Sequence, residues 1–556
     1  MSDFGSCRLP SSMDVDANLR VVGSYGRLQN LNCLIYALTV FPAAFQLTGI
    51  AFTMGQPEGY HCKPPEGFTA NETVPGWQES LDDWGETEID GCMFYDVRNG
   101  SVMENTTACD TGWQYQTSHG ETSVVTDLDL VCDRGFLGGT LQSSIPLGIL
   151  VGSYIIGQIS DTFGRRPALL VSLVGIVVFG TAMSVTWNYE LMFALGFMLG
   201  IFLPGILIVR YVRIIEMYTP KQRLVGHTFS AMPWCLGVML VGPFAYLMPD
   251  WRHFQLVATL PCVILIPLVW YSYESIRWLV QRGRIQEAER ILQKIAASKN
   301  IDQPRGLQSA TGAYLPLTVP TQADQDAGAQ HQNHNETCED VGACQTKRRG
   351  ARYTVLDLFK TRVLVLRSLV VFYCWFTSNF VYYGFTLNVT NLAGNKYLNF
   401  FLMSLTEIPC FIFDFFVILR FGRRRPLILF YELCGVACLL TAFIPKLTAS
   451  GVDLTILIVI VAMIGKFFIT AAFDVTYLVT AEVFPTILRN VGVGSASLFG
   501  RVGGIVAPFV VYLTFLHTSI PLLVFAVTSL VAGLLVLILP ETHNKPLPET
   551  LEDGAN

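Results

Sequence analysis

The sequence predicts an all-α membrane protein with twelve transmembrane helices in two six-helix halves. Three observations support this fold class: an apolar composition, twelve long apolar runs and an internal repeat. Of the 556 residues, 51% are hydrophobic and 14% are charged, whereas soluble domains carry about 25% charged residues. The 37 Phe, 21 Tyr and 9 Trp supply too much buriable surface for a disordered chain. The composition therefore argues against a soluble globular protein and excludes a disordered one.

The apolar runs define the elements in chain order. A helix needs about 20 apolar residues to cross a bilayer, and the runs cover residues 31–54, 137–159, 167–186, 190–215, 224–248, 254–272, 363–386, 397–420, 426–445, 452–480, 490–515 and 519–539. The first thirty residues are polar and lack the apolar segment of a signal peptide, so the first run is a retained helix. The predicted parts are an N-terminus (1–30), a first half (31–272) with a long loop (55–136), a connecting loop (273–362), a second half (363–540) and a tail (541–556).

Charge is distributed unevenly along the chain, and this sets the predicted orientation. The net charge of −6 argues against nucleic acid as a partner. The loop 55–136 alone carries sixteen acidic and three basic residues, a net of −13, which leaves +7 for the rest. Basic residues fill the short connections on the other side: Arg165, Arg166, Lys221, Arg223, Arg420, Arg423, Arg424, Arg425 and Arg489. By the positive-inside rule that side is cytosolic, together with both termini, and we expect a multi-pass plasma-membrane protein in contact with lipid.

The acidic loop has the features of an extracellular segment. It contains four cysteines, for which sequence leaves three pairings open, and three glycosylation sequons. The cysteines are Cys62, Cys92, Cys109 and Cys132, and the sequon asparagines are Asn71, Asn99 and Asn105. In the connecting loop, Ile285, Ala288, Leu292 and Ile295 share one face of a predicted amphipathic helix, which lies on the membrane or under the bundle. Residues 300–346 have no period and are predicted to be a flexible tether.

The internal repeat relates the two halves. Gly164-Arg-Arg-Pro recurs 258 residues later as Gly422-Arg-Arg-Arg-Pro. A Glu that stands seven residues before an Arg occurs as Glu216/Arg223 and, 266 residues later, as Glu482/Arg489. Glu274-Ser recurs 267 residues later as Glu541-Thr. Parallel repeats of this kind are typical of transporters of the major facilitator type, which rock two halves about a central site.

The charged landmarks of the repeat are candidates for conformational control. Arg165 and Arg166 can pair with Asp161 or Glu216, and such pairs hold the halves in one state and break in the other. The predicted gating set is Asp161, Gly164, Arg165, Arg166, Glu216, Arg223, Arg423, Arg424, Glu482 and Arg489. The alternative is that the basic residues only anchor the loops on the cytosolic side.

Several motifs resemble one transporter family. They are Gly157-Gln-Ile-Ser-Asp-Thr-Phe-Gly-Arg-Arg166, Glu274-Ser-Ile-Arg-Trp-Leu279, Gly465-Lys-Phe-Phe-Ile-Thr-Ala-Ala-Phe473, Thr480-Ala-Glu-Val-Phe-Pro-Thr-Ile-Leu-Arg-Asn490 and Pro540-Glu-Thr542. With the large loop after the first helix, the chain resembles the organic cation, organic anion and carnitine transporter family over nearly its whole length. The segment 388–399 and Gly492-Val-Gly494 are most similar to the carnitine and zwitterion branch. Tyr273, where the family usually has Pro, and Arg210 and Arg213 depart from its pattern, and we expect the two arginines to pair with Glu216 or with lipid headgroups.

Charges inside the predicted helices are candidates for substrate binding, because each costs about 2.5–3.5 kcal/mol to insert. The resemblance implies that Arg501 stands where cation-preferring members have Asp and anion and carnitine transporters have Arg. A guanidinium grips a carboxylate in bidentate fashion, so we expect Arg501 to hold a substrate carboxylate. The alternative is that Asp474 satisfies it. Asp474 or Glu407 is expected to face the ammonium end of a zwitterion, and Lys466 to be held by Asp474 or by carbonyls.

A quaternary ammonium group also favours aromatic faces. The candidate aromatic residues are Trp234, Trp375, Tyr382, Tyr383 and Phe473, although each taken singly is more often a packing residue.

These observations predict a polyspecific secondary transporter that moves carnitine-like zwitterions or organic cations by alternating access. The sequence has no metal-ligand cluster, phosphate loop or nucleophile motif, so we expect neither an enzyme nor a resident cofactor or metal, and sodium coupling stays open. The alternatives are an organic anion exchanger of the same fold, or a receptor or adhesion protein whose glycosylated loop carries the function. The substrate's identity and the oligomeric state are not defined by the sequence.

Overall fold

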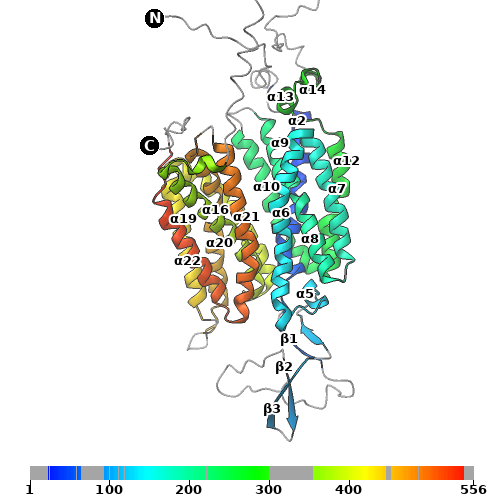
Figure 1. The fold of residues 1–556 in the computed structure, drawn as a ribbon, viewed down its shortest axis with the longest axis vertical. Coiled ribbons are helices and arrows are strands. Elements are labelled where there is room, and N and C mark those ends of the chain that lie inside the picture. The colour runs from blue at the N-terminus through cyan, green and yellow to red at the C-terminus, as the bar shows by residue number, and fades with distance from the viewer. Residues whose placement is uncertain are drawn as a thin grey trace, which may run out of the picture.

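A computed structural model describes residues 23, 26–57, 59–63, 93–98, 101–109, 112–117, 119–218, 223–299, 355–392, 394–445, 447, 452–485 and 488–543 (Figure 1). Within these residues, ten helices are long and apolar enough to cross a membrane. Two shorter apolar helices, Ala231–Leu247 and Ile520–Val536, bring the number to the twelve that the sequence predicts.

The first half is built from six spans. They contain α2 (Arg27–Leu38), α3 (Val40–Thr48) and α4 (Ile50–Thr53) in the first span, then α6 (Gly135–Phe163), α7 (Arg165–Ser184), α8 (Tyr189–Pro204) with α9 (Arg210–Glu216), α10 (Arg223–Leu247), and α11 (Trp251–Thr259) with α12 (Pro261–Tyr271). A π-helical turn, Gly205–Val209, joins α8 to α9 directly after Pro204. Such turns insert an extra residue into a helix and are frequent near functional sites.

The second half repeats this plan. Its spans contain α16 (Arg362–Asn388), α17 (Lys396–Leu405) with α18 (Glu407–Phe421), α19 (Arg424–Phe443), α20 (Thr455–Val483), α21 (Arg489–Tyr512) and α22 (Ile520–Val536). The 3-10 turns η4 (Val355–Phe359), η5 (Val389–Asn391) and η6 (Leu513–Phe515) lie at helix ends.

The loop after the first span adds strands that the sequence analysis does not predict. β1 (Gly59–Cys62) pairs antiparallel with β4 (Trp113–Gln116), and β2 (Met93–Arg98) pairs antiparallel with β3 (Ser101–Ala108). They lie with α5 (Val124–Asp127) at one end of the bundle (Figure 1), which we call the strand end.

Two short helices lie at the opposite end, which we call the α14 end (Figure 1). The predicted amphipathic helix is α14 (Ile285–Ala297), and its buried face consists of Ala288, Leu292, Ile295 and Ala296. This face packs against Trp278 and its neighbours in α13 (Ile276–Gln281), so the helix covers the bundle through α13. The predicted tether 300–346 lies outside the described residues.

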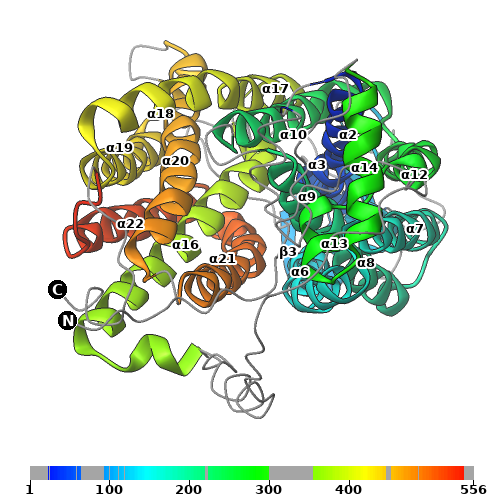
Figure 2. The same ribbon diagram turned by 90° about the horizontal axis from the view of Figure 1, so that it is seen from above.

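The two halves meet along two pairs of helices. Seen along the bundle, α10 of the first half lies beside α17 of the second, and α6 lies beside α21 (Figure 2). Ser143 Oγ in α6 donates to the Ile505 carbonyl in α21 over 2.8 Å. This boundary between the halves is where the predicted substrate residues are found.

Candidate functional site

Glu407 is the most deeply buried acid of the predicted site. It begins α18, is 1% exposed, and accepts a 2.6 Å hydrogen bond from the Tyr382 hydroxyl. Lys466 Nζ lies 3.7 Å from Glu407 Oε1 and donates to Thr386 Oγ1 over 3.1 Å. The negative charge of Glu407 is therefore neutralised by Lys466, which lies on a neighbouring helix of the same half. The sequence analysis expects Asp474 or carbonyls to hold Lys466, and Lys466 Nζ does donate to the Tyr382 carbonyl over 3.4 Å. Glu407, rather than Asp474, is the acid beside it, because α18 and α20 are packed together.

The first half also reaches this group across the boundary. The side chains of Cys235 and Trp234, both in α10, reach Glu407 and Tyr382 respectively. Lys466 Nζ additionally lies 3.2 Å from the centre of the Tyr382 ring. Trp234, Tyr382 and Glu407 thus lie together, and Lys466 lies beside Glu407, where the sequence analysis expects the ammonium group of a substrate.

Arg501 and Asp474 lie on the adjacent helices α21 and α20, and both are partly exposed. Arg501 acts electrostatically on the hydroxyls of Tyr383 and Tyr477. Asp474 acts in the same way on Tyr211, which comes from α9 in the first half. A positive and a negative side chain therefore stand on neighbouring helices of the boundary, next to tyrosines from both halves.

The predicted aromatic residues form one connected group. Tyr382 and Tyr383 meet edge to face at 5.4 Å, and Phe473 lies 6.0 Å from Tyr382 and 6.2 Å from Trp375. Trp375 is 2% exposed, and its indole N–H donates to Thr480 Oγ1 over 2.9 Å. It is thus a packing residue in this conformation and supports Tyr477, whose ring centre is 4.3 Å away.

Three residues of this site were not singled out from the sequence: Tyr477, Tyr211 and Cys235. Tyr477 is 45% exposed and three residues after Asp474, so helical spacing places both on one face. That spacing could have indicated Tyr477. Tyr211 and Cys235 carry no comparable signal, because they meet the other residues only across the boundary.

The repeated charges at the α14 end form the same structure twice. Glu274 accepts from the backbone N–H groups of Arg165 and Arg166 at the start of α7, over 3.2 and 3.1 Å. Glu541 accepts from those of Arg423 and Arg424 at the start of α19, over 3.0 and 3.1 Å. A carboxylate at a helix N-terminus is stabilised by unpaired N–H groups and by the helix dipole.

These hydrogen bonds also change the pKa of Glu541, which lies beyond α22. Burial raises its pKa, but the backbone donors led by Arg423 lower it more, so the net pKa is below the ordinary value.

The arginine side chains at this end pair within one half. Arg165 contacts Asp161 at 2.7 Å and Glu216 at 3.1 Å, all in the first half. Arg423 Nε lies 3.3 Å from Glu482 in the second half. The pairs therefore join helices of one half, whereas the sequence analysis expected them to hold the two halves together.

The remaining members of the predicted gating set have local roles. Arg166 donates to the Trp270 carbonyl, as Arg424 donates to that of Leu537. Arg489 begins α21, and the side chain of Arg223 lies outside the described part.

Gly164 and Gly422 let the two capping acids approach the backbone. Their φ angles are +114° and +88°, a region that side chains rarely adopt. A Cβ on Gly164 would lie 2.4 Å from Glu274 Oε2, and one on Gly422 would lie 2.9 Å from Glu541 Oε2. Each glycine of the repeat is thus required for the same reason, which is that a carboxylate caps the helix that follows it.

Two of the departures from the family pattern, Arg213 and Tyr273, contact each other in the structure. Arg213 is 1% exposed, and its guanidinium lies 5.3 Å from the Tyr36 ring centre and 5.1 Å from that of Tyr273. It donates to the carbonyls of Tyr273 and Glu274 over 2.9 and 3.2 Å. The expected pairing with Glu216 or headgroups is replaced by cation–π contacts between two rings. Arg210, also buried, donates to the Ile206 carbonyl.

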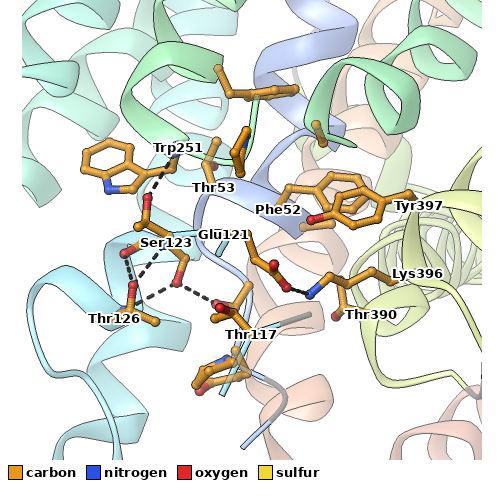
Figure 3. Close-up of a pocket in the computed structure, with 18 of the residues that line it drawn as sticks. Phe52, Thr53, Thr117, Glu121, Ser123, Thr126, Trp251, Thr390, Lys396 and Tyr397 are labelled. Carbon is orange, nitrogen blue, oxygen red and sulfur yellow. Dashed lines mark hydrogen bonds and ion pairs between the residues drawn. The ribbon is translucent and has the colours of Figure 1, made fainter. Parts of the chain in front are cut away.

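A charged contact joins the halves at the strand end. Lys396, the first residue of α17, is ion-paired with Glu121 of the loop that precedes α5 (Figure 3). Phe52 of α4 stacks on Tyr397 of α17 at 5.4 Å with an interplanar angle of 4°. These residues line a pocket together with Thr53, Thr117, Ser123, Thr126, Trp251 and Thr390 (Figure 3).

The Glu121–Lys396 pair is substantially shielded from water. The two side chains are 15% and 12% exposed. Burial raises the pKa of Glu121, but the hydrogen bonds from Lys396 and the backbone, together with the charge of Lys396, lower it more, so the net pKa lies below its ordinary value of 4.5. Neither residue was singled out from the sequence, because they are 275 residues apart and carry no shared motif.

The predicted modification sites of the long loop are only partly within the described residues. Cys109 and Cys132 take part in disulfide bonds. Cys62 ends β1, and Asn105 lies in β3. Asn71, Cys92 and Asn99 lie outside the described residues, so the three sequons and the cysteine pairing stay predictions.

The fold and the boundary site define a secondary transporter of the major facilitator type, and comparison with known proteins gives its family. The Major Facilitator Superfamily model matches residues 135–508. An organic cation transporter-like protein of Drosophila melanogaster is 34% identical over 98% of this chain and 92% of its own. Solute carrier family 22 member 2 of Rattus norvegicus is 31% identical over 98% and 95%. The chain therefore belongs to the organic cation transporter family, solute carrier family 22.

The solved structures show the same fold. An inward-open conformation of the xylose transporter XylE from E. coli aligns with a TM-score of 0.56 and 16% identity, covering 76% of this chain and 92% of that one. A partially occluded inward-open conformation of the same transporter aligns with a TM-score of 0.55 over 97% of this chain and 100% of that one. The family and fold predicted from the sequence are thus confirmed, and the chain is a transporter rather than an enzyme.

Proposed function

We propose that this protein moves small organic cations or carnitine-like zwitterions across the plasma membrane, with the strand end outside and both termini in the cytosol. The names of the relatives support an organic cation as substrate. The observation that supports a zwitterion is the placement of Arg501 and Asp474 on adjacent helices at the boundary. Arg501 binds the carboxylate, and Asp474 faces the ammonium group.

Glu407 has a different role from the one its position in the sequence suggested. Because Lys466 lies within 3.7 Å of it, Glu407 is not a free anion for a second ammonium group. It holds Tyr382 and Lys466 in place beside the aromatic group, and Asp474 is the acid that meets the substrate. The exposed ring of Tyr477, three residues further along α20, provides a face for a quaternary ammonium.

Alternating access follows from where the halves are joined. At the strand end, the Glu121–Lys396 pair and the Phe52–Tyr397 stack join the halves. At the α14 end, the ion pairs of Arg165 and Arg423 stay within one half. This conformation is therefore closed toward the outside, and breaking the strand-end contacts opens the site to extracellular substrate.

Uptake into expressing cells tests the substrate class. Labelled L-carnitine, tetraethylammonium and para-aminohippurate are compared with and without sodium, in the wild type, Arg501→Ala and Arg501→Lys. We expect carnitine uptake in the wild type, its loss in Arg501→Ala and partial retention in Arg501→Lys, since Lys keeps the charge without the bidentate fork. Tetraethylammonium uptake should survive both changes.

Three other outcomes separate the alternatives. Carnitine uptake that persists in Arg501→Ala at normal surface expression contradicts the carboxylate role. Preferential uptake of para-aminohippurate by the wild type identifies an organic anion exchanger. Binding without uptake of any probe identifies a receptor. The sodium arm decides whether transport is coupled to that ion.

A further inference from the structure

Two consecutive residues of the second half make the contact that joins the halves at the strand end. Lys396 forms the ion pair with Glu121, and Tyr397, the next residue, lies against rings of the first half (Figure 3). The centre of its ring is 5.4 Å from that of Phe52, on which it stacks, and 5.5 Å from that of Tyr246, which it meets edge to face. Lys396 and Tyr397 thus place a cation and an aromatic ring against the first half.

Glu121 is held in place by its own half. Its Oε2 accepts from the backbone N–H of His119 over 2.8 Å, and the His119 ring meets that of Tyr246 edge to face at 5.0 Å. Because the net pKa of Glu121 lies below 4.5, its side chain is a carboxylate at neutral pH. When the halves separate at the strand end, this carboxylate and the ring of Tyr246 stay together, because both belong to the first half.

A pocket lies beside the ion pair. Glu121, Phe52 and Tyr397 line it, together with hydroxyl side chains such as that of Thr117 (Figure 3). The nearby side chain of Tyr246 is 50% exposed even in this closed conformation. Withdrawal of the second half would therefore leave a carboxylate and two aromatic rings around one enlarged space.

These groups match one class of ligand. A carboxylate attracts an ammonium group, and aromatic faces bind both cations and other rings. The second half presents both groups at once, since Lys396 Nζ lies 5.6 Å from the ring centre of Tyr397. A small molecule with an ammonium group a few bonds from an aromatic ring presents the same two groups without being tethered to the protein.

We propose that Glu121, Phe52 and Tyr246 form an outer binding site for aromatic ammonium ions, which Lys396 and Tyr397 occupy while the strand end is closed. The ligand and Lys396 compete for one carboxylate, so a ligand that binds here shifts the population toward the open state. The extracellular location of the site and its part in delivering organic cations rest on the proposed function. The competition for Glu121 does not.

A pair of thiol reagents tests the charge of the site without any transport. In the full-length protein, Thr117→Cys places a thiol in the pocket, and Gln114→Cys, at an exposed position of β4, is the matched control. Each variant is labelled in intact cells with a methanethiosulfonate that carries either a trimethylammonium or a sulfonate group, and labelling is followed by peptide mass spectrometry. The ratio of the cationic to the anionic rate cancels changes in how often the strand end opens.

We expect Lys396→Met to raise this ratio at Thr117→Cys by about fivefold or more, the factor that one unit charge a few ångströms away gives even in bulk water. Glu121→Gln should lower the ratio, and Lys396→Arg should leave it near its original value. None of the three changes should alter the ratio at Gln114→Cys. A ratio at Thr117→Cys that Glu121→Gln does not change overturns the proposal, and so does an equal change at Gln114→Cys.

Protection by small ions tests the aromatic part of the site. Thr117→Cys is combined with Lys396→Met and labelled with uncharged methyl methanethiosulfonate in the presence of benzyltrimethylammonium, tetramethylammonium or phenylacetate. We expect benzyltrimethylammonium to protect at lower concentration than tetramethylammonium, and phenylacetate not to protect. Tyr246→Leu should remove the difference between the two cations, whereas Phe136→Leu, at an exposed ring at the start of α6, should leave it. Equal protection by the two cations, or protection by phenylacetate, overturns the aromatic ammonium site.

These outcomes are distinguishable from a failure of the proposed function. If neither cysteine reacts in intact cells and both react after permeabilisation, the proposed orientation is wrong, and the ratios measured after permeabilisation still decide the site. If no probe is taken up in the transport assay, the proposed transport fails. The labelling ratios need no transport and decide the competition for Glu121 in that case as well.

Discussion

Replacing Lys396 by Met should open the strand end. The change removes the cation of the Glu121–Lys396 pair and leaves Glu121 partly buried without its partner. A hydrogen bond to a charged group contributes about 1.5–3 kcal/mol, and both side chains are less than one-sixth exposed, so little is lost to solvent screening. Taking about 2 kcal/mol, and a factor of ten for each 1.36 kcal/mol, the closed-to-open equilibrium shifts roughly thirtyfold.

Cys235 provides the readout for this change. It is a free cysteine on α10, fully buried, and its side chain reaches Glu407 at the boundary. A membrane-impermeant maleimide is applied to intact cells, and modification of Cys235 is followed by peptide mass spectrometry. We expect labelling of Lys396→Met to be faster than wild type by up to the thirtyfold shift above, and labelling of Lys396→Arg to stay near wild type. Arg284→Met, which breaks an exposed pair with Glu287 at the α14 end, is the neutral control.

An unchanged labelling rate in Lys396→Met would refute the reasoning, provided that Cys235 reacts in denatured protein. It would mean that aromatic packing, led by the Phe52–Tyr397 stack, holds the strand end without the ion pair. Faster labelling in Arg284→Met as well would show that any loss of charge loosens the protein. Either result removes the Glu121–Lys396 pair from the proposed gate.

Three other predictions follow from the buried charges and the repeat. Because the pKa of Glu121 is lowered, its stabilisation of the closed state is complete above 4.5 and is lost as the pH falls below that value. Wild-type Cys235 labelling, divided by its rate in denatured protein at the same pH to remove the pH dependence of the thiolate, should therefore be flat from neutral pH and rise only in strong acid. Glu407→Gln should destabilise the purified protein by about 3–5 kcal/mol in thermal unfolding, and adding Lys466→Met should recover most of the loss. Gly164→Ala should cost at least about 1–2 kcal/mol in the same assay, because φ is +114° and its Cβ meets a carboxylate, whereas Gly157→Ala, which has open space, should not.

The sequence predicts the helices and the repeat well because both depend on local patterns. Apolar runs give the spans, and the first one, predicted at 31–54, extends over Arg27–Thr53 in the structure. The matched motifs around Gly164 and Gly422 correspond to two copies of one capping arrangement. The π-helical turn before Arg210 was not predicted, because a single extra residue in a helix leaves no periodic signal over so short a stretch.

The site was predicted less completely, because its contacts join different helices. Spacing within one helix suggested Asp474 as the partner of Lys466, but the neighbouring helix supplies Glu407 instead. Composition and spacing did identify the costly charges, including Arg501. They did not show which of them neutralise one another, such as Glu407 and Lys466.

The location of the ion pairs has a consequence for how the halves move. Arg165 and Arg423 each bind acids of their own half, so these pairs can persist while the halves rotate as rigid bodies. Glu121 and Lys396 come from different halves and must separate when the strand end opens. Opening of the strand end therefore requires free energy to break this pair. A variant that weakens an α14-end pair should lower the stability of one half, whereas one that weakens the strand-end pair should change the population of transport states.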